Sequence, residues 1–150
     1  MTLQEADNFF KSLKSETTKK SEIKVYEKFL HLLTALKGRE FSKDEIQSIE
    51  TELKSFDFES NRENKIKFYK KAFNKFETFL KDTFSLTVKD YYTRQGIILG
   101  SSYGILFGII FLGSFERSLG ILLGICIGLL IGLAMGKSLD SKAENESRVL

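Results

Sequence analysis

Charged side chains are distributed very unevenly along this chain of 150 residues. The 41 residues from Gly96 to Gly136 contain two charges, on Glu116 and Arg117, whereas the other 109 residues contain 41. Such segregation is typical of a water-soluble part joined to a membrane-embedded part, and it argues against a single globule. The absence of proline allows nearly all of the chain to be helical, and the single cysteine excludes an internal disulfide.

Two uncharged segments of 18 residues, 96–113 and 119–136, flank these two charges. As α-helices each would be about 27 Å long, close to the thickness of about 30 Å of a bilayer's hydrocarbon core. Only residues 114–118 connect the segments, so we expect two antiparallel neighbours. A buried hairpin in a soluble protein is the alternative, but the remaining chain is too small to cover two such helices. We therefore predict a transmembrane hairpin over residues 91–137.

Basic residues gather at the outer ends of the two segments. Lys81, Lys89 and Arg94 precede the first segment, and Lys137 and Lys142 follow the second. Short loops rich in Lys and Arg stay in the cytoplasm, whereas the link between the segments has one Arg beside one Glu. The pattern predicts a multi-pass protein of the cell inner (plasma) membrane, with its N- and C-termini in the cytoplasm.

The glycines of the two segments recur at intervals of four residues, in two ladders. These are Gly96, Gly100, Gly104 and Gly108, and then Gly120, Gly124, Gly128, Gly132 and Gly136. Residues four apart lie on one ridge of a helix, so each ladder would form a groove without side chains. Because lipid gives helices no hydrophobic drive to associate, close backbone packing has to provide it. The ladders therefore predict tight helix packing.

Two different partners are compatible with the ladders. They could face each other within one hairpin, or at least one of them could face another subunit. A ridge at four-residue steps drifts by about 40° per step, so the second ladder sweeps roughly 160° of its helix. One antiparallel helix is not expected to cover so wide an arc, which favours a homo-oligomer. Ser101, Ser102 and Cys126 are small residues that would suit the same close packing.

The C-terminal part of the chain resembles a group of bacterial membrane proteins described only as glycine-zipper proteins. The resemblance covers residues 91–150, with the YYTRQG segment, the two ladders and a charged tail that ends in RVL. Many members of that group have a small cytosolic helical part ahead of the hairpin. The resemblance implies a mode of helix packing and no particular activity.

Residues 1–90 show the start and stop signals of a bundle of four helices. Three capping boxes, in which a Glu follows a Ser or Thr by three residues, are Thr2 with Glu5, Ser42 with Glu45, and Ser60 with Glu63. A further helix is expected over residues 21–37, with Gly38 ending it. The 14 phenylalanines fall largely at helical spacing, which indicates a core more than a binding groove.

These signals together predict the fold class and the domains. We expect an all-α chain with a cytosolic helical bundle over residues 1–90, the transmembrane hairpin over 91–137, and a charged cytoplasmic tail over 138–150.

A basic stretch lies in the last predicted helix of the bundle. It comprises Arg62, Lys65, Lys67, Lys70, Lys71, Lys75 and Lys81, with Glu63 and Glu77 as its two acidic residues. Close to a membrane, such a face could bind anionic lipid headgroups. A solvated helix face is the plain alternative, and nucleic acid is disfavoured because no nucleic-acid-binding motif accompanies the charge.

The chain offers little material for catalysis. One His and one Cys cannot build a structural zinc site, and His31 is expected at the edge of the core. The stretch GLAMGKS lacks the spacing of a phosphate-binding loop, since three residues separate Gly132 and Gly136 where four are needed. We therefore expect no enzyme, no cofactor and no metal.

The sequence favours a non-enzymatic integral membrane protein that self-associates through its glycine ladders. Its cytosolic bundle would serve as a sensor or adaptor platform, and its partners would be the lipid bilayer, further copies of the chain and a cytosolic protein. The alternative is a homo-oligomeric pore or membrane-permeabilising effector controlled by the bundle. Ser101, Ser102, Tyr103 and the glycine backbones are the groups that could line such a pore.

Overall fold

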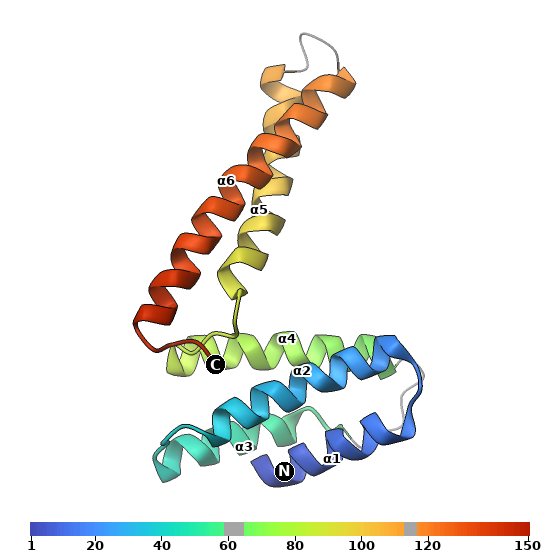
Figure 1. The fold of residues 1–150 in the computed structure, drawn as a ribbon, viewed down its shortest axis with the longest axis vertical. Helices are drawn as coiled ribbons and strands as arrows, with labels where there is room; N and C mark the ends of the chain where they lie inside the picture. The colour runs from blue at the N-terminus through green and yellow to red at the C-terminus, as the bar shows by residue number, and fades with distance from the viewer. Residues whose placement is uncertain (59–64, 113–116) are drawn as a thin grey trace. The chain divides into compact units, whose positions relative to one another are not determined.

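A computed structural model describes residues 1–58, 65–112 and 117–150. The helices, which Figure 1 shows in order along the chain, are α1 (Leu3–Glu16), α2 (Lys20–Lys37), α3 (Lys43–Ser55), α4 (Lys65–Phe84), α5 (Tyr91–Phe107), a π-helical turn (Gly108–Leu112) and α6 (Arg117–Asn145). The prediction of an all-α chain is confirmed. The chain forms two compact units, residues 1–86 with Leu150, and residues 87–149. We call them the bundle and the hairpin.

Two of the three predicted capping boxes are present in the bundle. At the start of α1, the amide of Glu5 donates to the Thr2 hydroxyl at 3.1 Å, and the Thr2 amide donates to the Glu5 carboxylate at 2.7 Å. Ser42 and Glu45 repeat this arrangement at the start of α3. The third box, at residues 60 and 63, lies outside the described residues.

Helix α2 ends at Lys37, as the glycine after it predicts. Gly38, however, keeps an ordinary right-handed conformation with φ −77°. Its amide donates to carbonyl oxygens of the last turn, among them that of Thr34 at 3.2 Å. Glycine therefore terminates this helix without the left-handed cap that glycine usually supplies.

Aromatic side chains form the core of the bundle. The rings of Phe10 in α1 and Phe29 in α2 stack with centroids 4.2 Å apart, and Phe29 meets Phe73 of α4 edge to face at 5.1 Å. Such pairs contribute about 0.5–1.5 kcal/mol each beyond their area of burial. Six of the phenylalanines are buried, as their interpretation as core residues predicts. They are Phe10, Phe29, Phe56, Phe58, Phe73 and Phe76.

One core residue lies outside the helical pattern. Phe58 follows the end of α3, yet its side chain is 2% exposed and its ring packs against Phe10, Phe29 and Tyr69. Helical spacing cannot identify such a residue, because its position depends on how the chain turns after α3.

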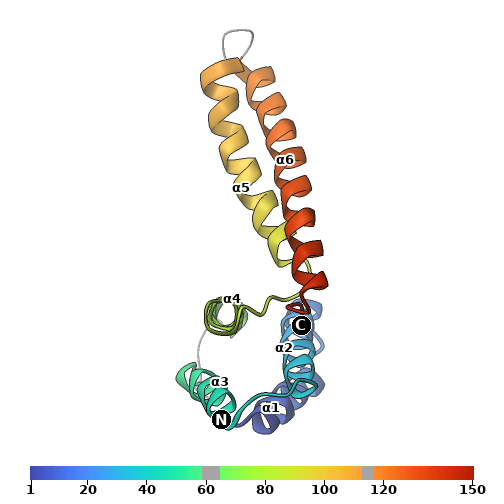
Figure 2. The ribbon, with the colours of Figure 1, turned by 90° about the vertical axis from the view of Figure 1, so that its left-hand side faces the viewer.

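The hairpin consists of α5 and α6, which lie side by side and antiparallel in both views (Figures 1 and 2). At their outer ends the helices extend beyond the predicted segments of 96–113 and 119–136, since α5 begins at Tyr91 and α6 continues to Asn145. The first part of the predicted tail is thus helical. No proline or glycine follows Gly136, so nothing in the local sequence stops α6 there.

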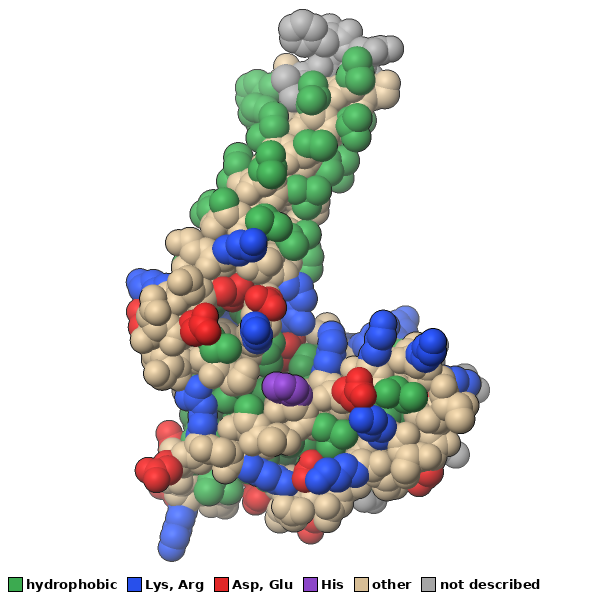
Figure 3. Space-filling view, viewed as in Figure 1, with side chains coloured by type: hydrophobic (Ala, Val, Ile, Leu, Met, Phe, Trp, Pro, Cys, Tyr) green, Lys and Arg blue, Asp and Glu red, His purple; other side chains and the backbone are tan. Residues whose placement is uncertain are grey.

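The apolar side chains of the hairpin point outward. Two stretches, Tyr91–Phe111 and Ser118–Asn145, are long and apolar enough to cross a membrane, and only 11% and 22% of their most apolar windows are buried. The core helices of a soluble protein would be mostly buried. Leu130 is 70% exposed and Ile110 is 68% exposed, and Figure 3 shows many hydrophobic side chains on the surface of the upper part of the hairpin. The chain therefore has two candidate membrane-spanning helices.

Candidate functional site

The two glycine ladders face each other along the contact between α5 and α6. Gly96 opposes Gly132, Gly100 opposes Gly128, Gly104 opposes Gly124, and Gly108 opposes Gly120. A methyl carbon added at Gly128 would lie 2.8 Å from the Cα of Gly104. One added at Gly124 would lie 2.7 Å from the Cα of Gly108. Because these obstacles are backbone atoms, no side chain fits unless the helices separate. We call this line of paired glycines the glycine seam.

The seam also brings Cα–H groups to carbonyl oxygens. The carbonyl oxygen of Gly128 is the atom nearest to the absent Cβ of Gly100, and the carbonyl oxygen of Gly100 is nearest to the absent Cβ of Gly128. The pairs Gly96 with Gly132 and Gly104 with Gly124 are reciprocal in the same way. A Cα–H bond therefore points at an oxygen in each case, and such contacts contribute about 0.5–1 kcal/mol each. Packing of this kind suits an environment without hydrophobic drive.

The structure thus places the ladders against each other within one hairpin, the first of the two arrangements considered from the sequence. Each glycine of the seam meets the backbone of the opposite helix. Contact with a second copy of the chain stays a prediction.

The four-residue register continues beyond the seam. The last ladder glycine, Gly136, lies against Tyr92 and Thr93, and a methyl carbon added to it would lie 2.5 Å from the Cα of Thr93. Four residues later, Asp140 occupies the next position on the same ridge of α6. Its carboxylate accepts hydrogen bonds from the amides of Tyr92 at 2.9 Å and Thr93 at 2.8 Å. Asp140 therefore caps α5 from the opposite helix.

This cap completes the hydrogen bonding at the start of α5. Asp90, the residue at the N-cap position, has φ 59° and makes no side-chain cap bond. The amide of Tyr91 donates to the carbonyl of Val88 at 3.1 Å, and that of Arg94 donates to the carbonyl of Asp90 at 3.0 Å. With the two amides that Asp140 accepts, all four initial amides have partners. A negatively charged carboxylate at the N-terminal end of a helix also interacts favourably with the helix dipole.

Sequence reasoning did not identify Asp140. A signal for it exists, because Asp140 continues the interval of the second ladder by one further step. Because the two helices are antiparallel, a residue one step beyond the last glycine of α6 lies beside the start of α5.

The C-terminus returns to the same end of the hairpin. After α6, Ser147 adopts a left-handed conformation with φ 55°, and the amide of Arg148 donates back to the carbonyl of Ala143 at 2.9 Å. The amide of Thr87 then donates to the carbonyl of Arg148 at 2.8 Å, beside an isolated parallel bridge between Thr87 and Val149. Residues just ahead of α5 are therefore tied to residues just after α6.

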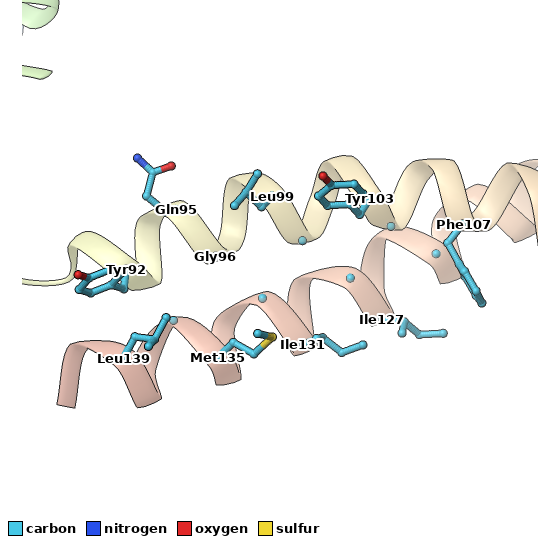
Figure 4. A pocket seen from close by; sticks show the side chains of 16 residues that line it. Tyr92, Gln95, Gly96, Leu99, Tyr103, Phe107, Ile127, Ile131, Met135 and Leu139 are labelled. Atoms are coloured by element: carbon cyan, nitrogen blue, oxygen red, sulfur yellow. The ribbon is translucent and has the colours of Figure 1, made fainter. Parts of the chain in front are cut away.

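An open apolar groove of about 530 Å³ runs along one edge of the glycine seam (Figure 4). Seven ladder glycines line it, all except Gly108 and Gly120. The longer side chains that line it are Tyr92, Gln95, Leu99, Tyr103 and Phe107 of α5, and Ile127, Ile131, Met135 and Leu139 of α6. We call it the seam groove. Its volume is in the range of ligand pockets, about 300–1,000 Å³, and its lining is almost entirely apolar.

The small polar residues do not contribute to the seam. The hydroxyls of Ser101 and Ser102 donate to the carbonyl of Ile98, at 3.0 and 2.9 Å. Ser102 and Cys126 are exposed on the outside of the hairpin. The expectation that these residues share the close packing of the ladders is wrong for Ser102 and Cys126, because they lie off the ridge that the glycines occupy.

The predicted basic face lies mainly on the exposed surface of α4. Five of its lysines are exposed, namely Lys65, Lys67, Lys70, Lys71 and Lys75, and Lys81 is half-buried. Arg62 and Glu63 lie outside the described residues, and Glu77 is buried. Figure 3 shows basic side chains gathered along the edge of the bundle where α4 and the start of α2 lie.

The single histidine and the acidic side chains were the remaining candidates for a chemical site. His31 is exposed on α2 (Figure 3), so its predicted place at the edge of the core is wrong. Within residues 1–58, 65–112 and 117–150, no three His, Cys, Asp or Glu side chains come close enough to hold a metal ion. No family model, curated protein or solved structure matches this chain. The resemblance to glycine-zipper proteins therefore stays a prediction.

Proposed function

We propose that this chain is a non-enzymatic integral membrane protein that self-associates through the seam groove, while its bundle serves as a cytosolic sensor or adaptor platform. One observation carries the proposal. Two long apolar helices expose their hydrophobic side chains and leave a groove lined with glycine between them. The exposed surface suits lipid, and the groove suits another apolar helix.

The glycines refine how the copies associate. The ladders are already packed against each other, so a second copy meets the seam from its open edge. Gly96, Gly100 and Gly128 are only half-buried and line the groove. A ridge of side chains from a second hairpin approaches the backbone closely at these positions, and small residues favour such approach in membranes.

The bundle occupies the cytosolic side in this proposal. The basic residues at the outer ends of the spans, Arg94 and Lys137 among them, support cytoplasmic termini. The bundle has a well-packed aromatic core of its own, which suits a platform that presents a stable surface to a cytosolic protein.

Cross-linking between copies tests the proposed interface. Cys126 faces away from the groove and is first replaced by Ser. Single cysteines are then introduced at Ile127, Ile131 and Met135, which line the groove, and at Leu130 as a control. Leu130 precedes Ile131 directly, so the two sites lie at the same depth in the membrane.

Under oxidising conditions, we expect disulfide-linked dimers from at least one groove variant and none from Leu130→Cys. Equal cross-linking at both faces would contradict an interface at the groove. The mass of the particle in native-membrane nanodiscs gives an independent readout. A monomer would exclude self-association and leave an adaptor that acts as a single chain.

The pore alternative has weaker support. The hydroxyls of Ser101 and Ser102 are engaged with a backbone carbonyl, so they are poor candidates for lining a water-filled path. Ion flux through reconstituted vesicles separates the two functions. We expect no flux. A closed ring of subunits with measurable conductance would show that the protein is a pore and contradict the adaptor function.

A further inference from the structure

The exposed face of α4 carries an ordered row of lysines. Lys67, Lys71 and Lys75 follow each other at four-residue intervals, so they lie along one ridge of the helix. The opposite face of α4 packs Phe73 and Phe76 into the core. We call these three residues the lysine row.

The lysine row lines a shallow concavity of about 770 Å³ on the surface of the bundle. Asn74 and Thr78 add neutral polar groups to its lining. Its two carboxylates are Glu52 of α3 and Asp82, near the C-terminal end of α4. The concavity is thus a basic surface with hydrogen-bonding groups along it.

Two of the three charges of the row, those of Lys71 and Lys75, are not neutralised within the described bundle. Lys71 and Lys75 form no ion pair with any described residue, in contrast to Lys11, which pairs with Asp7 at 3.0 Å. Like charges four residues apart on a helix repel each other. An external anionic surface would relieve this repulsion and complement the row.

The covalent chain keeps α4 close to the proposed membrane span. Six residues separate the last residue of α4, Phe84, from the first residue of α5, Tyr91. Fully extended, this connection spans at most about 25 Å. When α5 is inserted in a bilayer, the C-terminal end of α4 therefore remains within reach of the lipid headgroups.

We propose that the lysine row binds anionic phospholipid headgroups and thereby holds the bundle against the membrane surface. The ammonium groups donate hydrogen bonds to the phosphate oxygens. This inference rests on the proposed insertion of the hairpin. Each basic residue near an anionic surface strengthens binding about fivefold, so loss of the three lysines weakens docking by about a hundredfold.

The absence of tryptophan from the chain allows a direct experiment. The variant Thr78→Trp places a single fluorescent reporter beside the lysine row, on an exposed position of α4. The full-length protein is reconstituted into vesicles of phosphatidylcholine, with or without phosphatidylglycerol. With phosphatidylglycerol, we expect a blue-shifted emission that brominated lipids quench and that high salt reverses. Without it, we expect neither effect.

Matched charge variants show whether the lysine row is responsible. Replacing Lys67, Lys71 and Lys75 together by Gln should abolish the response to phosphatidylglycerol. Replacing Lys14, Lys43 and Lys54 by Gln removes the same charge from exposed positions on α1 and α3, and should preserve the response. Equal loss in both triple variants would overturn the proposal, because net charge alone would then explain the effect.

A second reporter separates this proposal from insertion of the hairpin. Leu122→Trp lies on the exposed surface of α6 and reports its contact with lipid in both kinds of vesicle. If the Leu122→Trp reporter is in lipid while the Thr78→Trp reporter ignores phosphatidylglycerol, the lysine row does not bind headgroups. If the Leu122→Trp reporter is in water, membrane insertion itself has failed. A response to an acidic polypeptide and not to phosphatidylglycerol would assign the row to a protein partner and overturn the lipid proposal.

Discussion

The carboxylate of Asp140, near the end of α6, accepts a hydrogen bond of 2.8 Å from the backbone amide of Thr93, in the first turn of α5. These residues are 47 positions apart in the chain. The bond fixes the relative register of the two helices at the end opposite their short link. The glycine seam fixes the same register along the rest of the hairpin, so the two features support each other.

Loss of this cap should destabilise the hairpin. Replacing a capping Asp by Ala costs about 0.5–2 kcal/mol, and we expect Asp140→Ala to lower the free energy of unfolding by that amount. Amide hydrogen exchange at Tyr92 and Thr93 should also become faster. Ser141→Ala, at the next exposed position of α6, is the control and should change neither quantity. Unchanged exchange at Thr93 in Asp140→Ala would contradict the cap.

A single methyl group should open the glycine seam. In Gly128→Ala, the new carbon meets the backbone of Gly100 and Gly104, which no side-chain rotation can relieve. Overpacking typically costs about 1–3 kcal/mol, and we expect at least this loss of stability in detergent micelles. Cys126→Ala, on the exposed side of the same helix, should be neutral. Equal stability of the two variants would show that the helices do not pack as closely as the structure has them.

The groove can be tested without damage to the seam. Gly104 and Gly128 both pack within the hairpin, so bulky residues there would disrupt the hairpin before they report on self-association. Side chains at the edge of the groove avoid this problem. Ile131→Ala should weaken association between copies, as measured by the particle mass at decreasing protein concentration. The unfolding midpoint of the isolated chain should change little.

The bundle should lose stability at high pH through Tyr69. Burial raises the pKa of Tyr69 to about 12, with a further contribution from Tyr26, and its hydroxyl donates to the carbonyl of Phe58 at 3.2 Å. Because the folded pKa exceeds the unfolded value of about 10, stability is complete below about pH 10 and falls between about pH 10 and 12. Urea titrations at increasing pH should show a loss of about 2–3 kcal/mol. In Tyr69→Phe, this component should disappear, and persistence of the full slope would exclude Tyr69 as its source.

At low pH, Asp7 should be the sensitive group. Burial would raise its pKa, but hydrogen bonds from Lys37 and Lys11 outweigh burial and hold the pKa of Asp7 below its ordinary value. The stabilisation is therefore present above the ordinary Asp range and is lost as the pH falls through the folded pKa. We expect Asp7→Asn to lower the free energy of unfolding at neutral pH by about 1–3 kcal/mol, with a smaller difference in acid. Asp82→Asn, on an exposed position, should have little effect at either pH.

Short-range patterns in the sequence determined much of this protein. The capping boxes at Thr2 and Ser42 join residues three positions apart, and hydrogen bonds over that distance form within one helical turn. The four-residue interval of the glycines places them on one ridge of each helix, whatever the rest of the chain does. Uncharged length likewise identifies two helices that can cross a membrane.

Contacts between distant segments were decided only by the tertiary structure. Periodicity shows that the ladders pack closely, but the antiparallel register determines that Gly100 meets Gly128 and that Asp140 reaches Thr93. Phe58 enters the core because of the path of the chain after α3, which helical spacing does not describe. The physical reason is the same in each case: a local pattern specifies which face of a helix is special, whereas the packing of whole elements selects what that face meets.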